Sequence, residues 1–139
     1  MRPPVVKRID HVGIAVPDLD AALEFYSTVF GVTSVHEEVN ESQGVREAMV
    51  SVGDTTIQLL APLNEDSTIA KFIDRSGPGL QQLAFEVENI DEAMSQLSAA
   101  GVRMLYSEPR TGTAGSRINF VHPKDAGGVL VELVEHTDS

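Results

Sequence analysis

A duplicated pattern of strands and helices constrains the fold of this chain more than any other feature of its sequence. The stretch from Ile9 to Val16 alternates apolar residues with small or polar ones, as a strand with two different faces does, and Gln81 to Val87 repeats that alternation. A helix cap follows each strand at the same distance, Asp18 in the first copy and Asn89 in the second. The repeat predicts two similar modules whose equivalent positions converge on one cleft.

The alternation in the first strand predicts that its two faces have different neighbours. Its apolar residues should pack against a helix, whereas His11, Gly13 and Ala15 on the other face leave room beside an imidazole for a ligand. Turn residues and apolar periodicity predict the remaining elements. We expect helices from Leu19 to Phe30, after Ser67 and from Ile90 to Ala100, and strands at Val32 to Val39, Val45 to Val52, Thr55 to Ala61, Leu80 to Val87, Val102 to Tyr106, Ser116 to Val121 and Val129 to Glu135.

This order predicts an α+β fold of two tandem, pseudo-symmetric βαβββ modules that form a curved mixed sheet around one shared cleft. Residues 1–139 would form a single domain, with a first module at 9–62, a helix and linker at 63–79, and a second module at 80–135. A coincidental alternation of strands and helices is the alternative, and the matched caps and strands argue against it.

Composition excludes several classes of partner and site. A net charge of -11 argues against binding to nucleic acid, which needs a basic surface. The chain has no cysteine, so any metal must be bound by histidine, amide or carboxylate groups. No apolar stretch reaches the length of a signal peptide or a membrane span. We therefore expect a cytoplasmic protein that binds neither nucleic acid nor membrane.

Four polar residues occupy equivalent places in the repeat, on strands that are otherwise apolar. They are His11 and Gln82 on the opening strands of the modules, and Gln58 and Glu132 on the closing strands. A buried polar group without a partner costs about 1–3 kcal/mol. One divalent cation would satisfy all four groups through an imidazole, two amide oxygens and a carboxylate.

Each of the four also has a plainer interpretation. His11 alone fits a hydrogen-bonded core histidine, and Gln58 and Gln82 fit ordinary polar strand residues. Glu132 is the hardest to dismiss, because a buried carboxylate needs a compensating cation. The metal site is therefore predicted by the set of four and not by any single member.

The chain also resembles a known family in several motifs. The stretches at residues 9–18, 41–47, 58–62, 77–82, 119–124 and 128–133 are similar to those of the methylmalonyl-CoA epimerase family, within the vicinal oxygen chelate (glyoxalase-like) superfamily. The resemblance implies that His11, Gln58, Gln82 and Glu132 are metal ligands. The family commonly has two histidines where this chain has Gln81 and Gln82, which puts the metal preference in question.

The resemblance implies a reaction as well as a metal site. The family interconverts the 2R and 2S forms of methylmalonyl-CoA, removing the α-proton to give a metal-stabilised enolate that is reprotonated on the other face. Glu47 and Glu132 are the expected proton carriers, although Glu47 also fits a solvated strand-edge glutamate paired with Arg46. The expected cofactor is one divalent metal, Co²⁺ first, with Mn²⁺, Ni²⁺, Zn²⁺ or Mg²⁺ as alternatives. A homodimer that acts on an acyl-CoA in propionate metabolism is expected.

Weaker signals concern charged and polar residues elsewhere. The resemblance implies substrate contacts for four residues of the second module, with surface solubility as the alternative for the arginine and the lysine: Arg117, Asn119, His122 and Lys124. Three acidic residues are expected to form a solvated loop: Glu37, Glu38 and Glu41. Alternative functions are another metalloenzyme of the superfamily, such as a glyoxalase-type isomerase, or a ring-cleaving dioxygenase, which usually needs two histidines. A metal-free protein of the same fold that sequesters a ligand is the third possibility.

Overall fold

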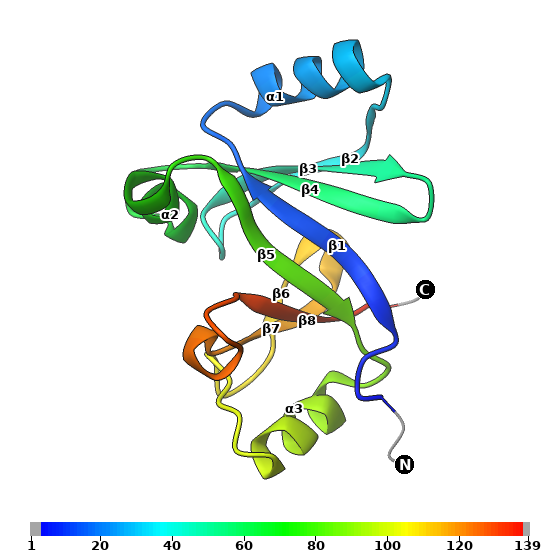
Figure 1. Ribbon diagram of the computed structural model, residues 1–139, viewed down its shortest axis with the longest axis vertical. Helices are drawn as coiled ribbons and strands as arrows, with labels where there is room; N and C mark the ends of the chain where they lie inside the picture. The colour runs from blue at the N-terminus through cyan, green and yellow to red at the C-terminus, as the bar shows by residue number, and fades with distance from the viewer. Residues whose placement is uncertain (1–3, 138–139) are drawn as a thin grey trace. The chain divides into compact units, whose positions relative to one another are not determined.

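The computed structural model describes residues 4–137 (Figure 1). The ends of the expected 1–139 domain lie outside these residues. The strands are β1 (Arg8–Ala15), β2 (Ser34–Asn40), β3 (Val45–Val52), β4 (Thr55–Pro62), β5 (Gly79–Glu86), β6 (Arg110–Thr111), β7 (Arg117–Val121) and β8 (Val131–Glu135). The α-helices are α1 (Leu19–Phe25), α2 (Thr68–Ser76) and α3 (Ile90–Ala99). This order confirms the α+β class and the repeated βαβββ arrangement.

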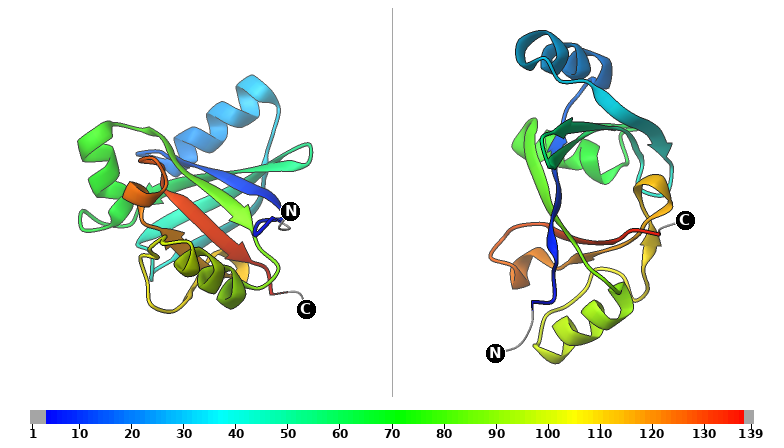
Figure 2. Two further views of the ribbon diagram at one scale, coloured as in Figure 1. Left: turned by 60° about the horizontal axis from the view of Figure 1, so that its bottom comes forward. Right: turned by 90° about the vertical axis from the view of Figure 1, so that its right-hand side faces the viewer.

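One compact unit comprises His11–Gln81. Its strands run in the order β2-β3-β4-β1, with β1 parallel to β4 and the other neighbours antiparallel. Helix α1 covers one face of these strands, as Figure 1 and the turned views of Figure 2 show, and Leu19 packs there against Ala48, Val50 and Leu59. Burial of these apolar side chains stabilises the layer, each by about 1.5–3 kcal/mol for a large residue. The predicted helix over the apolar face of β1 is confirmed.

The other face of β1 is only partly open. Ala15 packs with Val45, Leu60 and Ile69 of α2, so the volume that the sequence left beside this alanine is filled. The side chain of Ser67 caps α2 by accepting a hydrogen bond from the Ala70 N–H at 3.1 Å. The polar part of this face therefore begins at His11 and Gly13 and does not extend to the end of the strand.

The second unit comprises the described residues up to Asp10 together with those from Gln82 onward. Its strands run in the order β5-β8-β7-β6, with β5 parallel to β8. Helix α3, capped by Asn89, packs on one face through Ile90 and Ala93 against Val87 and Leu133. The other face carries Ala84, Ile118, Phe120 and Val134. The module bounds 9–62 and 80–135 stay a prediction from the repeat.

Two predicted elements need correction. Val102 to Tyr106 is not a strand: only Met104 forms a bridge, to Val121. Its continuation is prevented at Tyr106, whose backbone N–H and C=O bond to the side chain of Asn119 instead of to a neighbouring strand. The second correction concerns Glu37 and Glu38, which lie in β2 and not in a solvated loop.

The predicted first helix also differs at its end. After α1 the chain continues as a π-helical turn, Tyr26–Phe30, before Gly31 ends it at φ 70°. None of the described helices is long and apolar enough to cross a membrane.

Candidate active site

A row of polar side chains crosses the four strands of the His11–Gln81 unit on the face opposite α1. The register places Gly13 of β1 beside Gln58 of β4, Gln58 beside Met49 of β3, and Glu47 of β3 beside Glu38 of β2. Because residues two apart share a face, His11, Gln58 and Glu47 lie on one face, in a diagonal row that shifts by two residues from each strand to the next. The sequence predicted three of these residues as functional, and strand pairing brings them to one face.

Glu47 is a buried member of this row. Its side chain accepts a hydrogen bond from Nε2 of Gln58, at 3.1 Å from Oε2, and the residue is only 2% exposed. Arg46 points to the opposite face and pairs with Asp20 of α1 at 2.9 Å, which raises the pKa of the guanidinium and lowers that of the Asp20 carboxyl through their hydrogen bond. The interpretation of Glu47 as a solvated glutamate paired with Arg46 is therefore wrong.

His11 and Gln58 are both buried. His11 lies on β1 and Gln58 on β4, and the opposite face of both strands packs in the α1 core. The pairing of β1 with β4 therefore fixes where the imidazole and the amide are attached. The Nε2 atom of Gln58 is engaged as a donor to Glu47. The carbonyl oxygen is therefore the atom of this amide with the chemistry to bind a cation.

The second unit holds a similar amide and carboxylate pair. Nε2 of Gln82 lies 2.5 Å from Oε1 of Glu132, and the register places Ala84, two residues after Gln82, beside Glu132. The predicted burial of Glu132 is confirmed, because this residue is 5% exposed. Each unit thus contains a glutamine that donates to a buried glutamate.

The residue types in these two units fit a divalent cation. The imidazole of His11, the amide oxygens of Gln58 and Gln82 and the carboxylate of Glu132 supply one nitrogen ligand and three oxygen ligands, and such sets suit magnesium and first-row divalent ions. All of these residues are buried except Gln82, which is half-buried. With no cysteine in the chain, a thiolate site is excluded. The donor set is therefore chemically suited to the metal that the sequence predicts.

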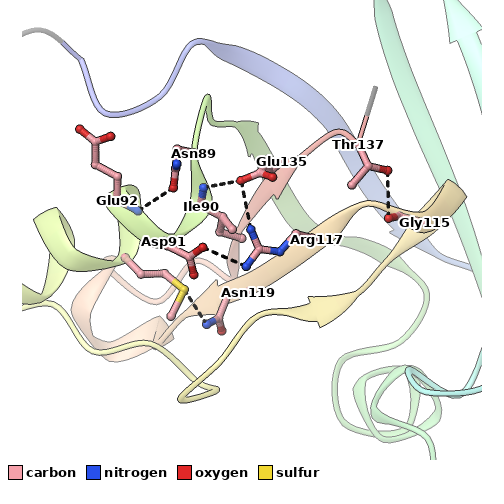
Figure 3. A network of polar contacts seen from close by, with 10 residues as sticks. Asn89, Ile90, Asp91, Glu92, Gly115, Arg117, Asn119, Glu135 and Thr137 are labelled. Atoms are coloured by element: carbon pink, nitrogen blue, oxygen red, sulfur yellow. Dashed lines mark hydrogen bonds and ion pairs between the residues drawn. The ribbon is translucent and has the colours of Figure 1, made fainter. Parts of the chain in front are cut away.

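Arg117 and Asn119 lie on the α3 face of β7, because Asn119 pairs in register with Leu133 and Arg117 with Glu135 (Figure 3). Arg117 forms ion pairs with Asp91 at 3.0 Å and with Glu135 at 3.5 Å. These carboxylates raise the pKa of its guanidinium, chiefly through the hydrogen bond to Asp91. Glu132 pairs with Phe120 and so faces the other way. The structure does not bring Arg117 or Asn119 together with Glu132.

His122 and Lys124 lie at the end of β7. Nδ1 of His122 accepts a hydrogen bond from the backbone N–H of Lys124 at 3.2 Å and caps the short helix Pro123–Asp125. Lys124 is exposed. The expected substrate contacts of Arg117, Asn119, His122 and Lys124 stay a prediction.

One group of ligand-type residues was not predicted from the sequence. Asp10, Glu86 and His136 bring three ligand atoms within 4.8 Å of one another, with Nε2 of His136 2.5 Å from Oδ1 of Asp10. Arg8 lies 3.3 Å from Glu86, and Lys7 lies 3.7 Å from it, so cationic side chains already neutralise part of this group. Asp10 adjoins His11 in sequence, but its distant partners gave no local signal.

Comparison with known proteins assigns this chain to a family. The profile of the Glyoxalase/Bleomycin resistance protein/Dioxygenase superfamily matches residues 10–120. The ethylmalonyl-CoA/methylmalonyl-CoA epimerase of Cereibacter sphaeroides is 40% identical over 93% of this chain and 98% of its own length.

Solved structures are similar over nearly the whole chain. The crystal structure of methylmalonyl-CoA epimerase from Mycobacterium tuberculosis has 54% identity and a TM-score of 0.95, covering 99% of this chain and 93% of its own. A variant of the Streptomyces coelicolor methylmalonyl-CoA epimerase, solved with 2-nitronate-propionyl-CoA, has 46% identity and a TM-score of 0.92, covering 96% of this chain and 99% of its own.

Proposed function

Because this chain belongs to the methylmalonyl-CoA epimerase family of the Glyoxalase/Bleomycin resistance protein/Dioxygenase superfamily, we propose that it interconverts the 2R and 2S forms of methylmalonyl-CoA. The observation that carries the proposal is the buried Glu47, held by the amide of Gln58 on a sheet face that also carries His11. Epimerisation requires a carboxylate base in a fixed position, and a buried, hydrogen-bonded glutamate meets this requirement. The relatives named as epimerases, one of them solved with an acyl-CoA analogue, support the same substrate class.

In the proposed reaction Glu47 removes the proton from the carbon between the thioester and the carboxylate. Glu132 protonates the planar intermediate on its other face, and the two residues exchange roles in the reverse direction. Gln58 and Gln82 hold these carboxylates in place through their amide nitrogens. The burial of Glu47 and Glu132 limits competition from water for the transferred protons.

We propose that His11, Gln58, Gln82 and Glu132 together bind one divalent metal ion. When bound, the ion would supply positive charge that stabilises the negative charge developing on the thioester oxygen. The proposal rests on the repeat, the family resemblance and the buried donors present in each unit. The cytoplasmic location and the homodimer stay predictions.

The function is tested by the exchange of substrate hydrogen with solvent. Wild-type protein in deuterated buffer should invert methylmalonyl-CoA and introduce deuterium at the α position. Glu47→Gln, which conserves volume and hydrogen bonding, should slow both processes by about 100-fold or more, because a proton-transfer group is lost. Glu41→Gln, an exposed loop variant, should retain full activity. Full activity of Glu47→Gln would remove this residue from the mechanism, and an inactive wild type under every metal condition would refute the function.

The metal site is tested by separate measurements of bound metal. Protein stripped with a chelator is given Co²⁺, Mn²⁺, Ni²⁺, Zn²⁺ or Mg²⁺ one at a time, and bound metal and activity are both recorded. His11→Ala and Glu132→Gln should each reduce metal affinity, whereas His136→Ala should not. Metal loss in His136→Ala alone would place the ion at the group of Asp10, Glu86 and His136.

A further inference from the structure

We propose that Glu38 and His36 of β2 carry the proton between Glu47 and solvent after each turnover. The proposal rests on the function proposed above and assigns a role to two residues that neither the sequence motifs nor the comparisons single out. It concerns the step that returns the enzyme to its starting protonation state, and not the inversion itself.

The reaction creates a need for such a step. Inversion in one direction leaves Glu47 with the proton that it took from substrate, and leaves Glu132 without the proton that it gave. A second turnover in the same direction requires Glu132 to regain a proton from solvent and Glu47 to lose its own, and the proposed path serves the second of these transfers. Glu47 is 2% exposed, so direct transfer to bulk water from its carboxyl group is restricted.

The strand register places a second carboxylate directly beside Glu47. Glu38 and Glu47 are partners in the antiparallel β2 and β3 pair, so their side chains share a face and their Cβ atoms lie about 4.5–5.5 Å apart. At this separation, two glutamate side chains can reach each other directly or through one water molecule. Glu37 pairs with Ala48 and points to the opposite face, which belongs to the α1 core.

His36 continues the path to the surface. Its Nε2 atom lies 2.6 Å from Oε1 of Glu38, within hydrogen-bonding distance. Exposure rises along the path, from the buried Glu47 to side chains that are 26% exposed at Glu38 and 41% exposed at His36. β2 is also the edge strand of its unit, so no further strand of that unit separates His36 from water. An imidazole is well suited to pass protons near neutral pH.

The proton balance of the path is simple. The protonated Glu47 gives its proton to the carboxylate of Glu38, Glu38 gives it to neutral His36, and the resulting imidazolium releases a proton to water. Each transfer moves one proton, and no other bond forms or breaks. The same path in reverse would protonate Glu47 when it serves as the acid.

The test separates inversion from proton return. In a single turnover, with enzyme in excess over methylmalonyl-CoA, no return step is needed. In sustained turnover, with product removed by a stereospecific consuming enzyme, the return step occurs in every cycle. Glu38→Gln and His36→Gln should keep the single-turnover rate within about twofold of wild type, yet slow sustained turnover by about tenfold or more. Glu37→Gln, the same change on the other face of β2, should alter neither rate.

Added imidazole provides a further test that a structural role would not pass. It should restore sustained turnover of His36→Gln, because a soluble base can accept the proton from Glu38. The relay is refuted if both variants sustain turnover as fast as wild type, if their single-turnover rate falls as much as the sustained rate, or if imidazole has no effect on a slowed His36→Gln. In each case wild-type epimerisation would leave the proposed function intact, whereas an inactive wild type would refute both.

Discussion

Replacing Asn119 by alanine should strongly destabilise the protein without a primary effect on substrate binding. Asn119 is fully buried, and its Oδ1 accepts hydrogen bonds from the backbone N–H groups of Tyr106 at 3.1 Å and Phe120 at 2.8 Å. Its Nδ2 donates to the Tyr106 carbonyl at 2.9 Å and lies 3.4 Å from Sδ of Met94, the contact that Figure 3 shows. This one side chain therefore ties the segment before β6 to β7 and to α3.

The expected cost follows from these contacts. Three neutral hydrogen bonds contribute about 1 kcal/mol each, and the backbone groups of Tyr106 would be left without this partner. The cavity left by the amide adds to this loss, so Asn119→Ala should cost about 3–5 kcal/mol. A domain of this size has about 5–15 kcal/mol of stability in total, so the variant should still fold at low temperature but melt early.

Urea unfolding gives the free energy of unfolding, and epimerisation kinetics at low temperature give the KM for methylmalonyl-CoA. Asn64→Ala is the matched control, because Asn64 also accepts a backbone hydrogen bond, from Asp66 at 3.0 Å, but is exposed. Its change should cost less than about 0.5 kcal/mol. A loss below about 1 kcal/mol in Asn119→Ala, together with a raised KM, would refute the structural role and favour the substrate contact.

Three further changes test local features. Gly44→Ala should lower the free energy of unfolding by about 1–3 kcal/mol in urea, because Gly44 has φ 70° and an added Cβ would lie 2.8 Å from Cβ of Ser67. An unchanged free energy of unfolding would contradict this explanation. Gln43→Met should raise the free energy of unfolding by about 1 kcal/mol, since Nε2 of Gln43 is buried without a hydrogen-bond partner, and a loss would show that this nitrogen is satisfied in solution. Hydrogen bonds from Arg103 lower the pKa of the Asp125 carboxyl far below its usual 3.8, so the ion pair stabilises the fold above pH 3.8 and loses this effect as the pH falls further. Asp125→Asn should therefore unfold more easily than wild type at neutral pH, and the difference in unfolding free energy should shrink in acid. A difference that stays constant with pH would count against the ion pair.

The order of elements could be predicted because local signals agree with the final packing. The side chains of Asp18, Ser67 and Asn89 each accept the capping hydrogen bond that the sequence predicts. The apolar periodicity of the strands was equally informative. The failure at Val102 to Tyr106 arose because a distant side chain, that of Asn119, binds the backbone groups that a strand would have paired.

In the candidate site, too, features that depend on local sequence could be predicted, and features that depend on contacts between distant residues could not. Residue type and repeat position were enough to select His11, Gln58, Gln82 and Glu132 as ligands, and that selection stays a prediction. The environment of Glu47 could not be predicted, because it depends on which residue of β2 and β4 stands beside it. The same dependence hid Glu38, which looks in sequence like one more acidic surface residue.

The two proposed proton carriers differ in their strand neighbours, although they belong to equivalent modules. Glu47 pairs with Glu38 on one side and with the buried Leu60 on the other, whereas both register partners of Glu132, Ala84 and Phe120, are apolar and buried. A proton on Glu47 should therefore exchange with solvent faster than one on Glu132. In deuterated buffer, the epimer that Glu47 deprotonates should then take up deuterium before it inverts, because Glu47 exchanges the proton for a deuteron and returns the deuteron to the same face. The epimer that Glu132 deprotonates should invert before it takes up deuterium in this way.

This difference can be measured by proton NMR of the remaining substrate, starting from each pure epimer at low conversion in deuterated buffer. Glu38→Gln should remove the difference by slowing exchange on the Glu47 side, and Glu37→Gln should preserve it, because Glu37 faces the α1 core side of β2. Equal deuterium uptake by both epimers in wild type would mean that both carboxyl groups reach solvent equally fast. In that case the polar neighbours of Glu47 would have no part in proton exchange, and the repeat would be functionally as well as structurally symmetric.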